Sequence, residues 1–302
     1  MTEITERVDR ALAVLRAGGL VAIPTETVYG LAADASNEAA VRRIFAAKGR
    51  PVDHPLIVHI GAPAGLYHWA AEVSPAAQIL ADTCWPGPLT LLVPKAAHVL
   101  DVVTGGRPTV GVRVPAHPLA LDLLARFGGG LAAPSANRFG KVSPTTAQHV
   151  VDDLGDAVDL VLDGGPCPVG VESTIVDCTV EPPQVLRPGG IPTEQVATLL
   201  GGLLSAASGP SRASGMLDSH YAPEARVLLV ESAAAAAACA ALHPGAVVID
   251  RTDDPAAYAR LLYSDLRAAD RHGASVVVAV LPPAVGLGHA IRDRLHKAAA
   301  NR

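Results

Sequence analysis

Residues 20–31 read LVAIPTETVYGL, an apolar run that leads directly into a polar segment. The first four residues are all apolar and predict a short buried strand. The segment 24–30 carries three hydroxyl groups and the carboxylate of Glu26. Hydroxyls both donate and accept hydrogen bonds, and a carboxylate can hold a cation or an ammonium group. The pattern indicates a binding site at a strand end, although an ordinary polar loop would fit the same spacing.

Helices are predicted on both sides of this strand. Apolar residues recur at helical spacing over residues 4–15, Gly18-Gly19 ends that helix, and Asn37 is a typical N-cap for a second helix through Ala47. Further strands are predicted over residues 56–60, 89–93, 110–114, 131–133, 158–162, 173–176 and 184–186, and further helices over 74–83, over 119–127 and after Ser143-Pro144. Because these elements do not alternate as regular βαβ units, we expect a twisted mixed sheet with flanking helices.

The chain changes character near residue 205. Gly, Ser and Ala dominate residues 205–223, which predicts a linker. Beyond it, strands over 227–230, 246–249 and 275–280 alternate with helices over 232–242, 255–268 and 287–299. This regular alternation predicts a small Rossmann-like parallel α/β domain. The expected fold class is α/β (α+β), with a mixed-sheet domain over 1–204, the linker over 205–223 and the second domain over 224–302.

The composition is that of a folded chain with little net charge. The 302 residues are 50% hydrophobic and 18% charged, and the formal net charge is −5. This balance excludes a strongly basic surface for nucleic acid, so any RNA contact is expected to be local and weak. The four cysteines form no CxxC pair, which favours a reducing compartment. Since no stretch is apolar enough for a signal core or a membrane span, we expect a cytoplasmic protein without membrane contact.

Several common catalytic motifs are absent from the sequence. It contains no GxxxxGK[ST], no HExxH, no GxSxG and no GxGxxG. What remains is polar segments at predicted strand and helix ends. Lys48-Gly49-Arg50 leaves the end of a predicted helix for a loop that contains His54. Cations there complement the helix dipole, but they would also clamp a polyphosphate, and the sequence leaves both readings open.

Other polar residues interrupt apolar runs farther along the chain. Arg113 lies within a predicted strand and needs an anionic partner, which is either a protein carboxylate or a ligand carboxylate. Ser135 and Asn137 follow another strand, Ser173 begins a third and Arg187 ends a fourth. Together with Lys48 and Arg50, these residues predict one concave site for an anionic ligand. The residues alone specify a nucleotide or polyphosphate beside a small acid.

The polar segments, taken in order, resemble the L-threonylcarbamoyladenylate synthase family, whose catalytic domain is called YrdC-like. The resemblance rests on seven motifs within residues 20–191: PTETVYGL, KGRP followed by HPLIVHI, WPGPLTLLVP, VGVRVP, PSAN, ESTIVD and LRPGGI. Residues 215–223, GMLDSHYAP, resemble the linker of the longer two-domain members, and the last part of the chain resembles their accessory domain. The resemblance implies that L-threonine, bicarbonate and ATP are joined to threonylcarbamoyl-AMP with release of pyrophosphate.

The resemblance also implies roles for individual residues. Lys48 and Arg50 are expected to act in catalysis, and Tyr221 in the linker is expected to help close the mouth of the site. The residues expected to face L-threonine are Thr27, His59, Arg113, Ala133 through its backbone, and Ser173. The residues expected to face ATP are Arg50, His54, Thr109, Ser135, Asn137, Ser143 and Arg187. No residues are assigned to a metal, because Mg²⁺ is expected to arrive through the ATP phosphates.

This chain departs from the family pattern at three places. His54 stands where Asn is common, Ala133 stands where Thr is frequent, and residues 217–219 are not basic as they are in other members. The expected downstream partner is a separate tRNA threonylcarbamoyl transferase. Two alternatives compete with the synthase: an RNA-binding or ribosome-associated module of the same fold, and a relative that uses carbamoyl phosphate. An excess of six anionic side chains in residues 1–204 argues against the first.

Overall fold

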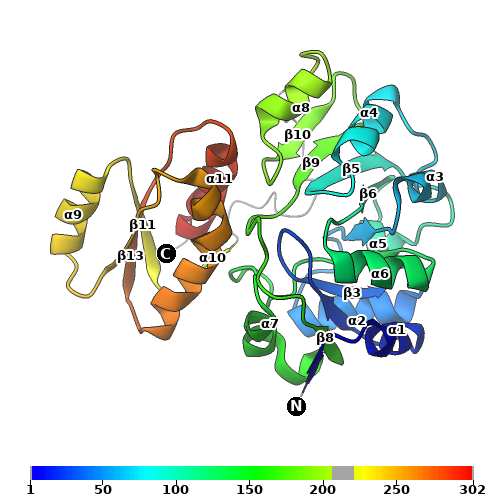
Figure 1. Ribbon diagram of the computed structural model, residues 1–302, viewed down its shortest axis with the longest axis horizontal. Coiled ribbons are helices and arrows are strands. Elements are labelled where there is room, and N and C mark those ends of the chain that lie inside the picture. The colour runs from blue at the N-terminus through cyan, green and yellow to red at the C-terminus, as the bar shows by residue number, and fades with distance from the viewer. Residues whose placement is uncertain (1, 206–220, 301–302) are drawn as a thin grey trace.

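The computed structural model describes residues 2–205 and 221–300, which form two units that contact each other (Figure 1). Most of the predicted linker, residues 206–220, lies outside the described residues, and so does the departure from the family pattern at residues 217–219. The larger unit holds a mixed sheet and its flanking helices. The smaller unit holds a three-stranded sheet, with α10 (Pro255–Arg271) and α11 (Leu287–Ala299) on the side toward the larger unit. No helix in the described ranges is long and apolar enough to span a bilayer.

Ten strands of the described chain form the large sheet, in the order β1-β8-β2-β3-β7-β4-β6-β5-β9-β10. Their bounds are β1 (Glu3–Thr5), β2 (Val21–Ile23), β3 (Gly30–Asp34), β4 (Ile57–His59), β5 (Leu89–Pro94), β6 (Thr109–Arg113), β7 (Leu131–Ala132), β8 (Leu160–Leu162), β9 (Thr174–Asp177) and β10 (Gln184–Arg187). The pairs β4/β6 and β5/β9 are parallel, whereas β2/β3, β4/β7 and β5/β6 are antiparallel. The prediction of a mixed sheet is therefore confirmed.

Helices cover both faces of this sheet. They are α1 (Val8–Arg16), α2 (Glu38–Lys48), α3 (Leu66–Trp69), α4 (Pro75–Cys84), α5 (Asp101–Thr104), α6 (Pro118–Phe127), α7 (Ala147–Leu154) and α8 (Thr193–Leu199), with short 3₁₀ turns at Pro63–Gly65 and Gly155–Ala157. Successive strand residues point to opposite faces. Val21 and Ile23 therefore pack on α1 and α6, whereas Ala22 between them packs in the core that contains α2, α4 and α7.

The smaller unit is a parallel α/β fold. Strands β11 (Arg226–Val230), β12 (Val247–Ile249) and β13 (Val276–Val280) pair in the order β11-β13-β12, and both pairings are parallel. Helix α9 (Ala233–Ala241) follows β11, α10 follows β12 and α11 follows β13. This confirms the parallel sheet and the predicted alternation of strands and helices.

Local sequence signals explain most of the helix and strand boundaries, but one of them led to a wrong prediction. The side chain of Asn37 accepts a hydrogen bond from the N–H of Ala40, so this N-cap is confirmed. The predicted helix cap at Ser143-Pro144 is wrong, because Thr146 caps α7 and Ser143 bonds a distant carboxylate instead. Strand β3 was not predicted, because its sequence GLAAD follows the polar segment without a turn signal.

Candidate functional site

A cavity lies where several strand ends of the large sheet meet. Nine of the fourteen predicted site residues line it. They come from the ends of β4, β6 and β10, from the loops after β2, β7 and α2, from the residue before β9 and, for Tyr221, from the segment before β11 (Arg226–Val230). The complete lining is Thr25, Thr27, Val28, Gly30, Arg50, Ile57, His59, Arg113, Ala133, Pro134, Ser135, Glu172, Ser173, Arg187 and Tyr221. The structure therefore brings together residues that are up to about 190 positions apart in sequence, as the single-site hypothesis requires.

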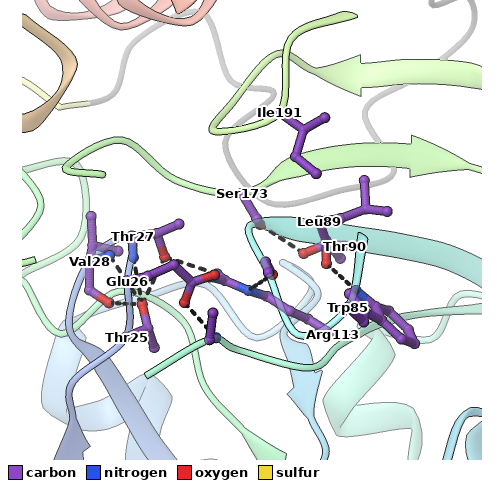
Figure 2. Close-up of polar contacts among 12 residues, drawn as sticks. Thr25, Glu26, Thr27, Val28, Trp85, Leu89, Thr90, Arg113, Ser173 and Ile191 are labelled. Carbon is purple, nitrogen blue, oxygen red and sulfur yellow. Dashed lines mark hydrogen bonds and ion pairs between the residues drawn. The ribbon is translucent and has the colours of Figure 1, made fainter. Parts of the chain in front are cut away.

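Arg113 occupies the centre of this site. Parallel pairing of β4 and β6 sets His59 beside Arg113, and both are the last residues of their strands. The guanidinium donates to Glu26 Oε1 at 2.6 Å, to Thr27 Oγ1 at 2.9 Å and to the carbonyl of Gly87 at 3.2 Å (Figure 2). A guanidinium has five N–H donors, so these contacts fix its plane and leave donors for a ligand in the cavity. The partner that the strand arginine requires is thus a protein carboxylate.

The polar segment after β2 is held rigid by Thr25. Its hydroxyl donates to the carbonyl of Val28 at 2.7 Å and accepts from the N–H groups of Thr27 and Val28 (Figure 2). It also lies 2.8 Å from the hydroxyl of Thr27. On the other side of Arg113, the hydroxyls of Thr90 and Ser173 are 2.7 Å apart. These bonds fix the hydroxyls of Thr27 and Ser173, two residues that line the cavity.

His59 contributes a neutral imidazole. Its burial and the charge of Arg113 lower the pKa of His59 to about 3, so the ring is uncharged near neutral pH. The ring nitrogen Nδ1 lies 3.3 Å from the carbonyl of Ile57. A neutral ring next to a guanidinium can donate or accept a hydrogen bond without adding charge.

Two further arginines give the cavity its cationic character. Arg187 is buried and donates from Nε and Nη2 to the carbonyl of Ser173, at 3.1 and 2.8 Å, and from Nη2 to its hydroxyl at 3.0 Å. Arg50 donates to the carbonyls of His54 and Pro55, at 3.5 and 3.1 Å. Burial lowers the pKa of Arg50 to about 10, so this guanidinium stays charged near neutral pH, and burial also lowers the pKa of Arg187. Buried guanidinium groups in a cavity favour an anionic ligand.

Lys48 lies behind the cavity wall. Its ammonium is buried and donates to the carbonyl of Ser135 at 2.6 Å and to the carbonyl of Asn137. Burial and then the charge of Arg50 lower the pKa of Lys48 well below its usual value. The lysine thus ties the loop after β7, which carries Ser135, to the end of α2. Its direct contact with a phosphate stays a prediction.

The other four predicted residues that do not line the cavity have different surroundings. The ring of His54 contacts that of Phe139, with centroids 5.3 Å apart, and Thr109 begins β6. Asn137 is buried and donates to the carbonyls of Arg138 and Lys141. Ser143 is buried and donates to Glu172 at 2.6 Å. Their contact with ATP stays a prediction.

The sequence did not predict that the carboxylates of Glu26 and Glu172 lie in or next to the cavity. Glu26 was expected to hold a cation, and its cation is Arg113 rather than a ligand. Glu172 lines the cavity and lies in the motif ESTIVD, of which only Ser173 is a predicted site residue. An acidic residue directly before a buried strand start is the signal that could have identified it. Within the described ranges, no group of three or more His, Cys, Asp or Glu residues is arranged to hold a metal ion.

Comparison with known proteins gives matches over nearly the whole chain. A family model described as "Telomere recombination" matches residues 13–189, and one described as "Threonylcarbamoyl-AMP synthase, C-terminal domain" matches residues 191–300. Threonylcarbamoyl-AMP synthase of Pyrococcus abyssi is 41% identical over 330 residues, which cover 99% of this chain and 97% of the relative. The Bacillus subtilis enzyme of the same name is 38% identical, over 98% and 94% of the two chains.

The fold comparison agrees with the sequence comparison. A crystal structure of P. abyssi Sua5 complexed with L-threonine superposes with a TM-score of 0.91 at 40% identity, over 99% of this chain and 97% of that one. The match therefore includes both sheets and the helices between them, not the larger unit alone. This chain belongs to the threonylcarbamoyl-AMP synthase family.

Proposed function

We propose that this protein joins L-threonine, bicarbonate and ATP to form threonylcarbamoyl-AMP and pyrophosphate. The observation that carries the proposal is the convergence of Arg113, Arg50 and Arg187 on one cavity. A small carboxylate and a polyphosphate are the two ligands that such a set of guanidinium groups would recognise. The similarity of the whole chain to enzymes named for this product supports the same reaction.

The half of the site around Arg113 suits L-threonine. Arg113 has donors directed into the cavity for the carboxylate, while Glu26 fixes the guanidinium from behind. Neutral His59 and the hydroxyls of Thr27 and Ser173 offer partners for the amine and the side-chain hydroxyl. Ala133 lines the cavity, and its backbone carbonyl is unaffected by the loss of the Thr side chain common in the family.

The half of the site around Arg50 and Arg187 suits ATP. Arg187 donates three hydrogen bonds to Ser173. Because Ser173 belongs to the threonine half-site, the two half-sites meet at this residue. The reaction then needs no covalent enzyme intermediate. The threonine nitrogen forms a bond to the carbon of CO₂ and releases a proton; with bicarbonate, the C–OH bond breaks and the hydroxide leaves with that proton as water. A carbamate oxygen attacks the α-phosphorus, and the bond from that phosphorus to pyrophosphate breaks. The protein supplies positioning and charge neutralisation.

Mg²⁺ is proposed to enter with the triphosphate. The carboxylates nearest the cavity, Glu26 and Glu172, are each bound to an arginine, so neither is arranged as a metal ligand. Mg²⁺ commonly binds through substrate phosphates and water, and it would neutralise phosphate charge when bound. The residues that would help it are Arg50 and Arg187, through their contacts with the same phosphates.

Tyr221 is proposed to close the cavity. Its side chain is buried, it lines the cavity and its φ of 62° lies in the left-handed region that residues other than Gly rarely adopt. The cavity has a volume of about 50 Å³, far less than the roughly 300–1,000 Å³ of pockets that enclose larger ligands. We infer that Tyr221 moves outward to admit ATP and returns when the site is filled.

The product defines the next step. Threonylcarbamoyl-AMP is an activated mixed anhydride, so we propose that a separate tRNA threonylcarbamoyl transferase consumes it in the cytoplasm. Direct contact of this chain with tRNA is proposed to be weak, because the larger unit carries an excess of anionic side chains.

The deciding experiment is mass detection of threonylcarbamoyl-AMP. Purified protein is incubated with MgATP, bicarbonate and L-threonine, and each substrate is left out in turn. We expect the product and pyrophosphate only in the complete mixture. Pyrophosphate release that does not depend on threonine would contradict the proposal, and salt-sensitive RNA binding without any pyrophosphate would favour the RNA-binding alternative.

A Lys48→Met variant tests the loop that Lys48 holds. Loss of the ammonium leaves the carbonyls of Ser135 and Asn137 buried without their donor. An unmet buried acceptor costs about 1–3 kcal/mol, so we expect a lower melting temperature and about a tenfold lower kcat. Thermal unfolding and pyrophosphate release measure the two effects. Lys95→Met, which removes a lysine that contacts Asp101 on the surface, is the matched control. An unchanged melting temperature for Lys48→Met would contradict the role.

A further inference from the structure

Glu172 connects the cavity with the smaller unit. Its carboxylate accepts hydrogen bonds from Ser143 Oγ at 2.6 Å, from Tyr263 Oη at 2.8 Å and from Arg294 Nε at 2.7 Å. Tyr263 lies on α10 and Arg294 on α11, so two of its three partners come from the smaller unit. The exposed fractions of Glu172 and Arg294 are 6% and 1%, which makes this a buried ion pair in the wall of the site.

The surrounding contacts hold this pair firmly. Gly170 has a φ of +83°, and a Cβ at this position would lie 2.4 Å from the Cα of Arg260, so α10 rests directly on the loop that leads to Glu172. Arg267 on α10 bonds Asp153 at 2.6 Å and also the carbonyl of Val142. The smaller unit thus contacts two segments next to the carboxylate: the loop at Gly170, which leads to Glu172, and the segment at Val142, which leads to Ser143. Movement of Glu172 away from Arg294 is therefore restricted.

The negative charge of Glu172 would disfavour an anionic ligand in the cavity, and Arg294 supplies a cation that neutralises it. A carboxylate in the wall of a site for a polyphosphate repels the ligand, and in a buried site that repulsion is weakly screened. Burial by itself would raise the pKa of Glu172, but the charges of Arg294 and Arg187 and the bond from Ser143 lower it to about 2. The carboxylate is thus ionised near neutral pH and lies under the influence of two arginines, one of which belongs to the proposed ATP half-site.

Tyr221 is part of the same cluster. The guanidinium carbon of Arg294 lies 5.2 Å from the centre of the Tyr221 ring, and the rings of Tyr221 and Tyr263 are 5.7 Å apart. A cation over an aromatic face attracts it. Arg294 therefore contacts two residues of the cavity wall, Glu172 and Tyr221, although it does not line the cavity itself.

We propose that Arg294 is a positioning residue of the smaller unit that neutralises Glu172, so that Glu172 neither repels ATP nor competes with it for Arg187. The inference rests on the proposed function, because it assigns Arg187 to ATP. It makes α11 part of the ATP half-site through a single buried ion pair. The smaller unit then contributes to nucleotide affinity without touching the nucleotide.

Three variants of the full-length protein test this role. Arg294→Met removes the cation that pairs with Glu172 and leaves only Arg187 to oppose its charge, so we expect KM for ATP to rise about tenfold or more while KM for threonine changes less than about threefold. The double variant Glu172→Gln/Arg294→Met removes both charges, and KM for ATP should return to within about threefold of the wild type, since neutral isosteres often replace a buried ion pair without loss. Arg292→Met, which breaks a pair with Glu231 on the exposed side of the same helix, is the control.

The measurements are pyrophosphate release with each substrate varied and calorimetric binding of a non-hydrolysable ATP analogue. Formation of threonylcarbamoyl-AMP by the wild type is checked first, so a failure of the proposed function is seen separately. An equal rise in both KM values for Arg294→Met, or a double variant as impaired as the single one, would show a purely structural role and overturn the proposal. If Arg294→Met does not fold, the double variant decides alone: wild-type ATP affinity supports the proposal, and a tenfold loss overturns it.

Discussion

Replacing Arg113 with methionine is expected to lower kcat/KM for L-threonine about a hundredfold or more, because truncating one member of a buried charge pair typically costs 2–5 kcal/mol of binding. Arg113 is the cation in the cavity that Glu26, Thr27 and Gly87 hold in one plane. Methionine keeps much of the side-chain volume but offers no donor to a carboxylate. KM for ATP is expected to stay within about threefold, since the proposed ATP half-site relies on other arginines.

The measurement is pyrophosphate release with threonine and ATP varied separately. Arg113→Met also leaves Glu26 buried without its cation, so a stability loss accompanies the binding loss. The double variant Glu26→Gln/Arg113→Met removes the stranded charge and restores the melting temperature without restoring threonine use. If the double variant recovers threonine affinity, or if KM for ATP rises as much as KM for threonine, the assignment of the two half-sites is wrong.

The site residues at strand ends could be predicted because polar and charged side chains stand out against the apolar runs that surround them. Arg113 interrupts an apolar strand, and only an anionic partner explains it. The sequence left open whether that partner is a protein or a ligand carboxylate, and the structure adds Glu26, which is 87 residues away. Register explains why His59 and Arg113 meet, since parallel pairing aligns the ends of β4 and β6. Short strands without turn signals carry no register information in the sequence.

The spacing of residues in the sequence did not predict the direction in which each side chain points. Lys48 and Arg50 are two positions apart at a helix end, yet Arg50 lines the cavity and Lys48 points behind its wall. Gly49 adopts a left-handed conformation that ends α2 and turns the chain between the two cations. The sequence motif places both residues near the site, but only the backbone turn decides which of them faces a ligand.

The contribution of the smaller unit could not be predicted at all. Arg294 and Glu172 are 122 residues apart, and the other charges of the same helix pair locally: Asp293 with Arg294 and Lys297, and Arg292 with Glu231. Nothing in the local pattern of residues 287–299 separates a buried arginine from an exposed one. Such pairs across a domain boundary depend on how the two units dock, which local patterns of charge and hydropathy do not encode.

Replacing Arg187 with lysine is the second variant with a large expected effect. Arg187 forms three hydrogen bonds to Ser173, two to the carbonyl and one to the hydroxyl, and also lines the cavity. A lysine keeps the charge but lacks the planar fork of donors. We expect kcat/KM to fall about a hundredfold for both substrates, because charge-assisted bonds to buried groups each contribute about 1.5–3 kcal/mol.

Arg187→Lys is expected to lower kcat/KM for both substrates, whereas Arg113→Met is expected to lower it mainly for threonine. Ser173 lies between the two proposed half-sites, so its displacement is expected to disturb threonine binding while the altered cation disturbs ATP binding. Pyrophosphate release with each substrate varied measures the effect, and Arg126→Lys, at an exposed pair with Asp122, controls for the exchange itself. A loss confined to ATP would mean that Ser173 keeps its place without the guanidinium fork. Arg187 would then act as a charge alone, and the two half-sites would be independent rather than joined at Ser173.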